Sequence, residues 1–228
     1  MQNIESIYIS GVFVRELKNR FLCEVKINGK VEECYVPSSC HLSNFLQLEG
    51  KRVLLIPTQT PNSRTKYALF AVPFKKNYIV LNTSMSNRAI EDGLQGRHFS
   101  YLGKRKKWIK EHKIDGYKAD LYIPSTKTII EIKSIISLRE PAIFPTVYSE
   151  RTINQLRHIQ QLLLDGYRVC FFIVSLHPYV KAVTIDKNSE FYIELSKCLS
   201  MGLVVKAYTS RLKSNVLSID KEISLNYQ

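Results

Sequence analysis

Two carboxylates and a lysine, Asp120, Glu131 and Lys133, lie in two short strand-like segments that a turn at 124–127 separates. The segments are rich in Ile, Leu, Tyr and Thr, and the turn is Pro-Ser-Thr-Lys, a composition typical of a β-hairpin. A hairpin centred on this turn pairs Asp120 with Glu131, so both side chains share one face with Cβ atoms roughly 5 Å apart. Lys133 lies diagonally across from Asp120, and we expect the three charged groups to converge on that face.

A trio of this kind can carry out metal-dependent hydrolysis. Two close carboxylates repel each other, and a hard divalent cation such as Mg²⁺ or Mn²⁺ relieves the repulsion through oxygen coordination. Such a cation polarises a phosphodiester oxygen and lowers the pKa of a bound water, while Lys133 orients that water or neutralises charge on the phosphate. On this stretch alone the alternative is a solvated hairpin face with a cross-strand salt bridge, because short motifs often occur by chance.

The charge balance indicates the class of partner. The 228 residues include 33 Lys and Arg against 20 Asp and Glu, which gives a net charge of +13 and a pI of about 9.5. The hydrophobic fraction of 45% and the charged fraction of 23% are those of an ordinary globular protein. The excess of positive charge therefore favours nucleic acid as the first partner and an anionic membrane surface as the second.

Other features of the sequence indicate a cytoplasmic protein. No apolar run approaches the length of a membrane span, and the N-terminus lacks the basic and apolar regions of a signal peptide. The five cysteines are scattered without a Cys-x-x-Cys pair, which predicts free thiols in a reducing compartment and no zinc site. We therefore expect a cytoplasmic location and no membrane partner.

The first eighty residues predict a small β-barrel. Five strand-like segments follow one another with turn residues between them, and Asn28-Gly29 is a strong hairpin signal. The segments are 7–14, 21–27, 31–36, 51–57 and 67–72. About five short strands favour an OB-fold, whose members often bind nucleic acid through a basic groove with aromatic platforms. A solvated basic surface is the alternative for the cations of this region, which are Arg15, Lys18, Arg20, Lys51, Arg52, Arg64 and Lys66.

The rest of the chain predicts an α/β domain with a mixed sheet. Ser84 or Ser86 could cap a first helix, and apolar residues at helical spacing define a longer helix after the hairpin. This order predicts two domains, 1–80 and 81–228, the second having an antiparallel start and parallel crossovers. The expected helices cover 87–94, 149–164 and 189–201, and the expected strands after the hairpin cover 167–174 and 203–208.

The most basic stretch of the chain leads directly into the hairpin. It covers 97–118 and contains the only tryptophan, Trp108, next to a run of four cations. A run of this kind is often only a solvated face, but its position before the candidate metal site favours attraction to a phosphate backbone. The four cations are Lys104, Arg105, Lys106 and Lys107.

These residues also resemble a known motif and a known family. Asp120, followed after ten residues by Glu131-Ile132-Lys133, resembles the D-x(n)-(D/E)-x-K motif of PD-(D/E)XK nucleases. Nearly the whole chain resembles the SfsA family, named for sugar fermentation stimulation protein A. The matching pieces occur in family order and are Asn19-Arg20-Phe21, Leu81-Asn82-Thr83, Asn87-Arg88, Lys118-Ala119-Asp120, Glu131-Ile132-Lys133-Ser134, Phe144-Pro145, Ser149-Glu150-Arg151, Phe171-Phe172-Ile173-Val174 and Gly202 to Tyr208.

The resemblance implies an N-terminal OB-like β-barrel followed by a PD-(D/E)XK nuclease-fold domain, in a protein that binds DNA. Asp120 and Glu131 would then hold the metal, and Lys133 would assist the attacking water. Glu91 matches a position from which such nucleases often supply a further acidic ligand; a core-facing or solvated Glu is the alternative there. Arg151 is expected to contact a phosphate, with a structural ion pair at a helix start as the alternative. Together with the basic stretch, the expected DNA-binding residues are Arg20, Arg88, Lys104, Arg105, Lys106, Lys107, Lys118 and Arg151.

The chain departs from the family pattern around the trio. Pro37-Ser38-Ser39-Cys40 replaces a family turn that contains Asn and Gly, and Lys118 replaces an Arg, which keeps the charge but loses bidentate geometry. Thr146 replaces the family's Asp after Phe-Pro, and Asn154-Gln155 replaces its Lys-His. The trio is intact while its surroundings differ, so the resemblance supports the fold more directly than it supports catalysis.

Three functions follow from these observations. The first is a DNA-binding protein that hydrolyses phosphodiester bonds with Mg²⁺ or Mn²⁺. The second is a non-catalytic DNA-binding regulator of transcription in sugar (maltose) metabolism, which the resemblance implies. The third is an RNA-directed barrel protein, because phosphate contacts do not distinguish the two polymers. For the first two we expect double- or single-stranded DNA to be held mainly through its backbone, by a monomer or a homodimer.

Overall fold

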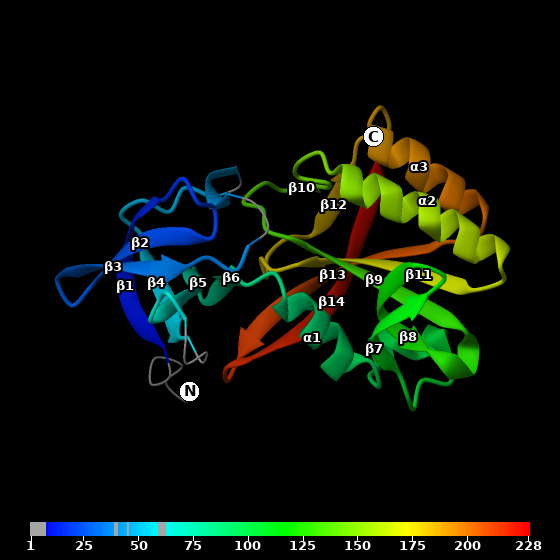
Figure 1. The fold of residues 1–228 in the computed structure, drawn as a ribbon, viewed down its shortest axis with the longest axis horizontal. Helices are drawn as coiled ribbons and strands as arrows, with labels where there is room; N and C mark the ends of the chain where they lie inside the picture. Colours follow the sequence, from blue (N-terminus) through cyan, green and yellow to red (C-terminus); the bar gives the residue numbers. More distant parts are fainter. Residues whose placement is uncertain (1–7, 39–40, 45, 59–62) are drawn as a thin grey trace.

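The computed structural model describes residues 8–38, 41–44, 46–58 and 63–228. Two sheets lie side by side, a barrel on the left of Figure 1 and a larger mixed sheet on the right. The first residue of the first predicted strand and half of the Pro37–Cys40 turn lie outside the described residues. Within the described ranges, no helix is long and apolar enough to cross a membrane.

The N-terminal sheet is the predicted OB-like barrel. β1 pairs with both β2 and β4, and β3 pairs with β2 and, in parallel, with β5, which closes the sheet on itself. Asn28 and Gly29 connect β2 to β3 with φ angles of 49° and 83°, as a two-residue hairpin turn requires. A sixth strand extends the sheet beside β5 and was not predicted. The strands are β1 (Ile9–Glu16), β2 (Leu22–Ile27), β3 (Lys30–Tyr35), β4 (Arg52–Pro57), β5 (Tyr67–Phe74) and β6 (Asn77–Val80), with a 3₁₀ turn, η2 (Leu42–Asn44), before β4.

The second sheet has the strand order β10-β12-β14-β13-β11-β9-β8-β7. β8 and β9 form the predicted antiparallel hairpin, and β9, β11 and β13 run parallel to one another, as the predicted crossovers require. Four strands were not predicted, and one of them, β7, lies inside the basic stretch. The strands are β7 (Ile109–Ile114), β8 (Tyr117–Ile123), β9 (Thr128–Ile135), β10 (Ala142–Ile143), β11 (Arg168–Ser175), β12 (Ala182–Ile185), β13 (Val204–Lys213) and β14 (Val216–Tyr227).

The three predicted helices are present. Ser149 and Ser189 cap α2 and α3 by accepting the backbone N–H groups of Thr152 and Tyr192. Ser84 occupies the cap position of α1 but makes no side-chain capping bond. The helices are α1 (Met85–Gly93), α2 (Glu150–Leu164) and α3 (Glu190–Ser200), with two further 3₁₀ turns, η3 (Arg97–Leu102) and η4 (Pro124–Thr126).

Helices cover both faces of the second sheet, so its central strand β11 is apolar on both sides. Phe171 packs with α2 and α3, whereas Phe172 packs with α1 and η3 on the opposite face. β9 alternates in the same way, since Ile130 and Ile132 face α1 while Ile129 faces α2. Glu131 and Lys133 therefore lie on the α2 face, and α2 is the helix placed to contact them.

The barrel and the second sheet share one core. Ile136, Leu176, Leu212 and Leu217 of the second sheet region pack in the same buried cluster as the barrel residues. The N–H of Val80, at the end of β6, also donates to the carbonyl of Leu176. The two parts of the chain are thus joined by packing and hydrogen bonding as well as by sequence.

Arg105 has a structural role in this arrangement. Its guanidinium donates hydrogen bonds of 2.5–3.2 Å to four backbone carbonyls. Three of them follow the end of α1, where carbonyls lack partners within the helix. This cation, expected to bind DNA, therefore closes the loop after α1. The four carbonyls belong to Leu94, Gln95, Gly96 and Gly103.

Replacing Arg105 should destabilise the fold. In Arg105→Ala several carbonyls lose a charged donor, which should lower the free energy of unfolding by about 1–3 kcal/mol. The adjacent Lys106 is exposed, so Lys106→Ala should change this value by less than about 0.5 kcal/mol. Denaturant unfolding of the two variants measures the difference, and equal stabilities would contradict the structural role.

Candidate active site

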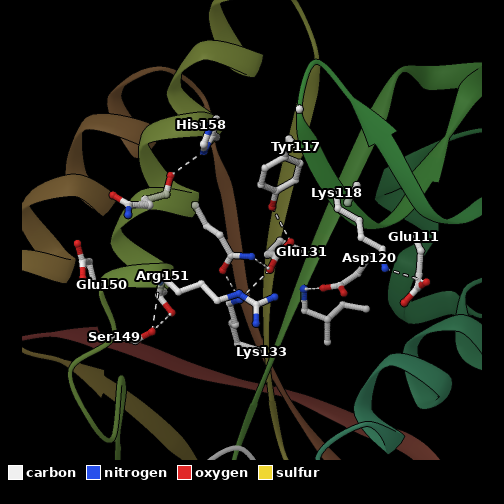
Figure 2. Close-up of a pocket in the computed structure, with 16 residues that line it drawn as sticks. Glu111, Tyr117, Lys118, Asp120, Glu131, Lys133, Ser149, Glu150, Arg151 and His158 are labelled. Carbon is white, nitrogen blue, oxygen red and sulfur yellow. Dashed lines mark hydrogen bonds and ion pairs between the residues drawn. The ribbon is translucent and has the colours of Figure 1, made fainter.

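A cavity of about 950 Å³ opens between the β7–β8 hairpin, β9 and the first turns of α2 (Figure 2). Asp120, Glu131 and Lys133 all line it, so the structure brings the predicted trio into one space. Lys118 and Arg151, two of the expected DNA-binding residues, line the same cavity. Five of the residues selected from the sequence therefore meet here.

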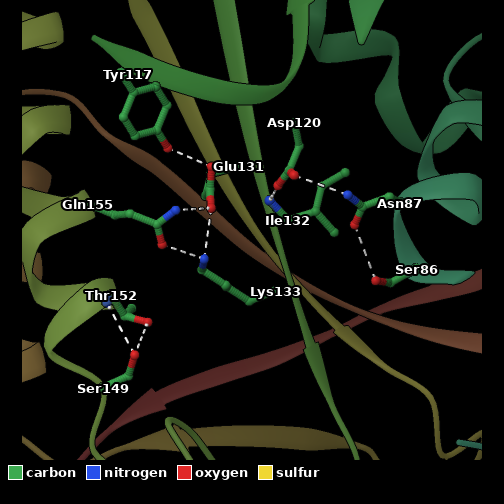
Figure 3. Close-up of polar contacts among 10 residues, drawn as sticks. All are labelled: Ser86, Asn87, Tyr117, Asp120, Glu131, Ile132, Lys133, Ser149, Thr152 and Gln155. Carbon is green, nitrogen blue, oxygen red and sulfur yellow. Dashed lines mark hydrogen bonds and ion pairs between the residues drawn. The ribbon is translucent and has the colours of Figure 1, made fainter. Parts of the chain in front are cut away.

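Asp120 lies where strands β8 and β9 separate. The hairpin has the predicted register, with Leu121 opposite Ile130. This is the last pair of the ladder, so Asp120 and Glu131, which would form the next pair, are not paired through their backbones. The N–H of Ile132 on β9 instead donates to the Asp120 carboxylate at 2.7 Å. The other carboxylate oxygen accepts a 3.0 Å hydrogen bond from Nδ2 of Asn87 on α1 (Figure 3). Asp120 is thus anchored from both β9 and α1.

Glu131 is only 2% exposed and accepts three hydrogen bonds. The Tyr117 hydroxyl donates to Oε2 at 2.5 Å, while Lys133 Nζ and Gln155 Nε2 donate to Oε1 at 2.7 and 3.0 Å. Lys133 Nζ also donates to Oε1 of Gln155, so these three side chains form a closed triangle (Figure 3). Because a buried carboxylate is costly unless it is paired, this network is what allows Glu131 to lie there.

The two carboxylates influence each other electrostatically. Burial and then the charge of Glu131 raise the pKa of Asp120 from 3.8 to about 6, although the Ile132 N–H, Lys133 and Asn87 act in the opposite direction. Burial, followed by the charge of Glu131, also raises the pKa of Tyr117, so its hydroxyl stays protonated as a donor. The negative charge around Asp120 is therefore not fully compensated by the protein, which favours a cation at this position.

The N-terminal part of α2 forms the opposite wall. Arg151 is exposed, its side chain points into the cavity above Lys133 in Figure 2, and it makes no hydrogen bond or ion pair with any described residue. His158 lies two turns further along α2, with Nδ1 at 3.1 Å from the carbonyl of Asn154. α2 thus provides an unpaired guanidinium beside the trio.

Glu91, the expected third metal ligand, does not line the cavity. It forms an ion pair with Lys110 at 2.7 Å and accepts a 3.2 Å hydrogen bond from Nε1 of Trp108. The residue of α1 that reaches Asp120 is Asn87, one turn earlier on the same helix face. The structure therefore pairs Glu91 with β7 and its flanking tryptophan.

Of the remaining expected DNA-binding residues, Lys118 lines the cavity and the others lie outside its lining. Lys118 pairs with Glu111 at 2.9 Å, and both line the cavity. Arg88 is exposed, and its Nε lies 3.6 Å from Oδ2 of Asp92 on the same helix. Arg20 lies on the barrel. Exposed side chains without an ion pair to any described residue are those of Lys104, Lys106 and Lys107.

Three side chains that donate hydrogen bonds to the two carboxylates were not given a role from the sequence: Tyr117, Asn87 and Gln155. Strict alternation along β8 places Tyr117 and Asp120 on opposite faces, so the pattern did not connect Tyr117 with Glu131. Asn87 was noted only as part of the family match. Gln155 lies beside the apolar stripe of α2, and its replacement of the family's His was the one signal that could have identified it.

The donor set fits a hard divalent cation. Mg²⁺ in proteins typically uses one or two carboxylates and completes its shell with water and phosphate oxygens. Asp120 and Glu131 supply two such carboxylates to one cavity. Among the residues that the structure describes, no group of three or more His, Cys, Asp or Glu side chains is placed to hold a metal. A site with two carboxylates is therefore the arrangement that this chain offers.

Family comparison covers both parts of the chain. Residues 84–216 match the family model described as the sugar fermentation stimulation protein RE domain, and residues 16–81 match the SfsA N-terminal OB domain. The chain belongs to the SfsA family. The two matches meet between β6 and α1, where the barrel ends and the polypeptide enters the helix that carries Asn87.

Individual SfsA relatives are similar over nearly the full length. Two proteins named sugar fermentation stimulation protein homolog come from Pelagibacter ubique and Maridesulfovibrio salexigens. The first is 25% identical over 95% of this chain and 96% of its own, and the second is 26% identical over 94% and 92%. The structure of Pyrococcus furiosus SfsA in complex with Ca²⁺ matches with a TM-score of 0.82 at 20% identity, covering 97% of this chain and 96% of that one. This last similarity shows that the two proteins share the SfsA fold.

The raised pKa of Asp120 predicts a pH limit for metal binding. A divalent cation binds the ionised carboxylate, so stabilisation by Mn²⁺ should be present at pH 7.5 and should disappear as the pH falls through about 6. Thermal unfolding with and without Mn²⁺ measures this. Asp120→Asn should abolish the stabilisation, whereas Asp92→Asn, at an exposed position of α1, should retain it.

A second variant tests whether Asp120 sets the pH midpoint of the stabilisation by Mn²⁺. His158 also lines the cavity, and histidine is a common metal ligand in proteins. In His158→Gln the midpoint of the Mn²⁺ effect should stay where it is in the unmodified protein. A midpoint that moves in this variant, or a Mn²⁺ effect of equal size at pH 5 and pH 7.5, would contradict the assignment to Asp120.

Proposed function

We propose that this SfsA family member binds DNA in the cytoplasm and hydrolyses its phosphodiester bonds with Mg²⁺ or Mn²⁺. The observation that carries the proposal is the convergence of Asp120, Glu131 and Lys133 in one open cavity, at whose wall Arg151 pairs with none of the described residues. Carboxylates, an ammonium and a guanidinium are the groups that phosphodiester hydrolysis uses to hold a cation, a water and a phosphate.

Each residue has a distinct role in this proposal. Asp120 and Glu131 would hold the cation, which when bound would polarise a phosphate oxygen and lower the pKa of a water. Lys133 has three N–H donors, of which Glu131 and Gln155 take two. The third is left to orient the attacking water or to donate to the phosphate as its charge grows.

Phosphate binding is proposed for the cations around the cavity. Arg151 presents a planar guanidinium that has no partner among the described residues, a geometry that suits two hydrogen bonds to one phosphate. The exposed lysines at 104, 106 and 107 precede β7, whose hairpin with β8 forms the cavity wall. Together with the net charge of +13, they support backbone contacts along a DNA strand.

The similarity to a Ca²⁺-containing structure adds support. Pyrococcus furiosus SfsA, which has the same fold, is in complex with Ca²⁺ in its solved structure. Ca²⁺ and Mg²⁺ are both hard cations that prefer oxygen ligands. A carboxylate site for such a cation in the present chain is consistent with that complex.

A second candidate function is a DNA-binding regulator without catalysis, in the setting of sugar metabolism that the family name indicates. The observation that favours it is the closed network of Glu131, whose two oxygens already accept bonds from Tyr117, Lys133 and Gln155. A carboxylate satisfied in this way is stable without a metal. The two candidates share DNA binding and differ in whether the cavity cleaves it.

Cleavage of DNA tests the first candidate. Purified protein should cut plasmid or single-stranded DNA with Mn²⁺ or Mg²⁺, and EDTA should stop it. Lys133→Met and Glu131→Gln should each reduce the rate by about 10²-fold or more, because each removes a group that acts on the water or the cation. Gel electrophoresis of the products with time measures the rate.

The chain offers a matched control for the Glu131–Lys133 pair. Glu222 and Lys206 form an ion pair of 2.6 Å on β13 and β14, away from the cavity wall. Glu222→Gln should cut DNA at the unmodified rate. If all variants cut equally, the activity is a contaminant; if none cuts while DNA is still bound, the regulator is favoured.

DNA affinity should depend on Arg151 and on salt. Arg151→Ala should weaken binding and reduce the slope of log K against log salt by about 1, the contribution of one phosphate contact. Arg157, on the same helix, pairs with Glu190 and Glu194, so Arg157→Ala is the control and should leave the slope unchanged. Fluorescence anisotropy in EDTA measures both, and RNA bound more tightly than DNA at equal salt would favour the RNA-directed alternative.

A further inference from the structure

The barrel carries an exposed aromatic pair close to the start of α1. Phe21 and Tyr35 are 38% and 41% exposed, and their rings are nearly parallel, with an angle of 17° and centroids 6.5 Å apart. The guanidinium of Arg20 lies 4.8 Å from the centroid of the Phe21 ring and makes no ion pair with any described residue. The two rings and this cation thus lie together on one exposed surface of the barrel.

A separate cavity of about 380 Å³ adjoins these rings. The barrel contributes Phe21 and Tyr35 with the residues that follow β3, and the opposite side is the segment 82–84 that leads into α1. The volume is within the range of small-ligand sites. The described lining contains no acidic side chain, so nothing there repels a phosphate.

Hydrogen bonds connect this cavity to the candidate active site. Thr83, which lines it, donates through its N–H to the carbonyl of Pro37 on the barrel. The Thr83 carbonyl accepts hydrogen bonds from the hydroxyls of Ser86 and Ser134 at 2.8 and 2.7 Å. Ser134 follows Lys133 on β9, and one residue after Ser86 comes Asn87, the partner of Asp120. The aromatic cavity and the trio are thus attached to the same turn of α1.

We propose that Phe21 and Tyr35 form a stacking platform for an unpaired base of the nucleic acid strand that enters the active site. The inference rests on the proposed function, because it specifies which form of nucleic acid that site accepts. Aromatic rings bind bases through their faces, and a base inside a duplex has both faces covered by its neighbours. The preferred substrate is therefore single-stranded DNA or a duplex end with unpaired bases, with Arg20 beside the stacked base.

The test compares strands that differ only in their bases. The unmodified protein, in EDTA, should bind a single-stranded oligonucleotide about tenfold more tightly than an equally long abasic strand of the same charge. The double variant Phe21→Leu with Tyr35→Leu keeps the apolar bulk and loses the rings. It should bind both strands with the affinity that the unmodified protein has for the abasic strand.

Two further variants separate stacking from folding. Tyr35→Phe keeps the ring and should retain the preference for bases. Val31→Ala removes exposed apolar surface from the same sheet, where Val31 is 55% exposed, and should also retain it. Thermal unfolding of the double variant should match that of the unmodified protein.

The outcomes distinguish this inference from the proposed function. Equal affinity of the unmodified protein for natural and abasic strands would overturn the platform and leave backbone binding and cleavage intact. An unchanged preference in the double variant would overturn it in the same way. No binding to any strand, together with no cleavage in the Mn²⁺ assay, would overturn the proposed function and the platform with it.

Discussion

The hydrogen bond from the Ile132 N–H to Asp120 is the interaction on which the candidate site depends. The β8–β9 ladder ends at Leu121 and Ile130, so β9 continues with a buried backbone donor that needs an acceptor. Asp120 supplies this acceptor, and the hydrogen bond fixes its carboxylate where β8 and β9 separate. One break in pairing therefore anchors Asp120 beside the cavity that Glu131 and Lys133 also line.

The two carboxylates are supported from opposite faces of the sheet. Asn87 on α1 holds Asp120, whereas Gln155 on α2 holds Glu131. Each carboxylate is thus oriented by its own helix, and the geometry between them is set by how α1 and α2 clamp β9. Burial and then the charge of Glu131 raise the pKa of Asp120, so this support does not fully offset the cost of burying one carboxylate near another. In the proposed function, a bound cation would relieve this cost.

Local patterns in the sequence predicted much of this fold. The hairpin register followed from the turn and from strand alternation, and α2 followed from apolar residues at helical spacing, because these signals lie within a few residues. The choice between Glu91 and Asn87 could not be made in this way, since both lie on one face of α1. It depends on Lys110 of β7 and on Trp108 just before that strand, and β7 was not predicted because it lies inside a charged run. In the same charged run, the sequence did not distinguish Arg105, which donates hydrogen bonds to backbone carbonyls, from the neighbouring lysines, which are exposed.

The shared core fixes the barrel relative to the candidate site. Leu176, Leu212 and Ile136 pack among barrel residues, so the position of the barrel relative to β9 is fixed by buried apolar contacts. The chain leaves the barrel after β6 and within a few residues forms the turn that carries Asn87 and hydrogen bonds to Ser134. In the proposed function, a nucleic acid strand bound near Phe21 would therefore already be placed relative to Asp120, without any movement of one part against the other. The turn that leads into α1 lines the aromatic cavity, and α1 itself holds Asp120 through Asn87.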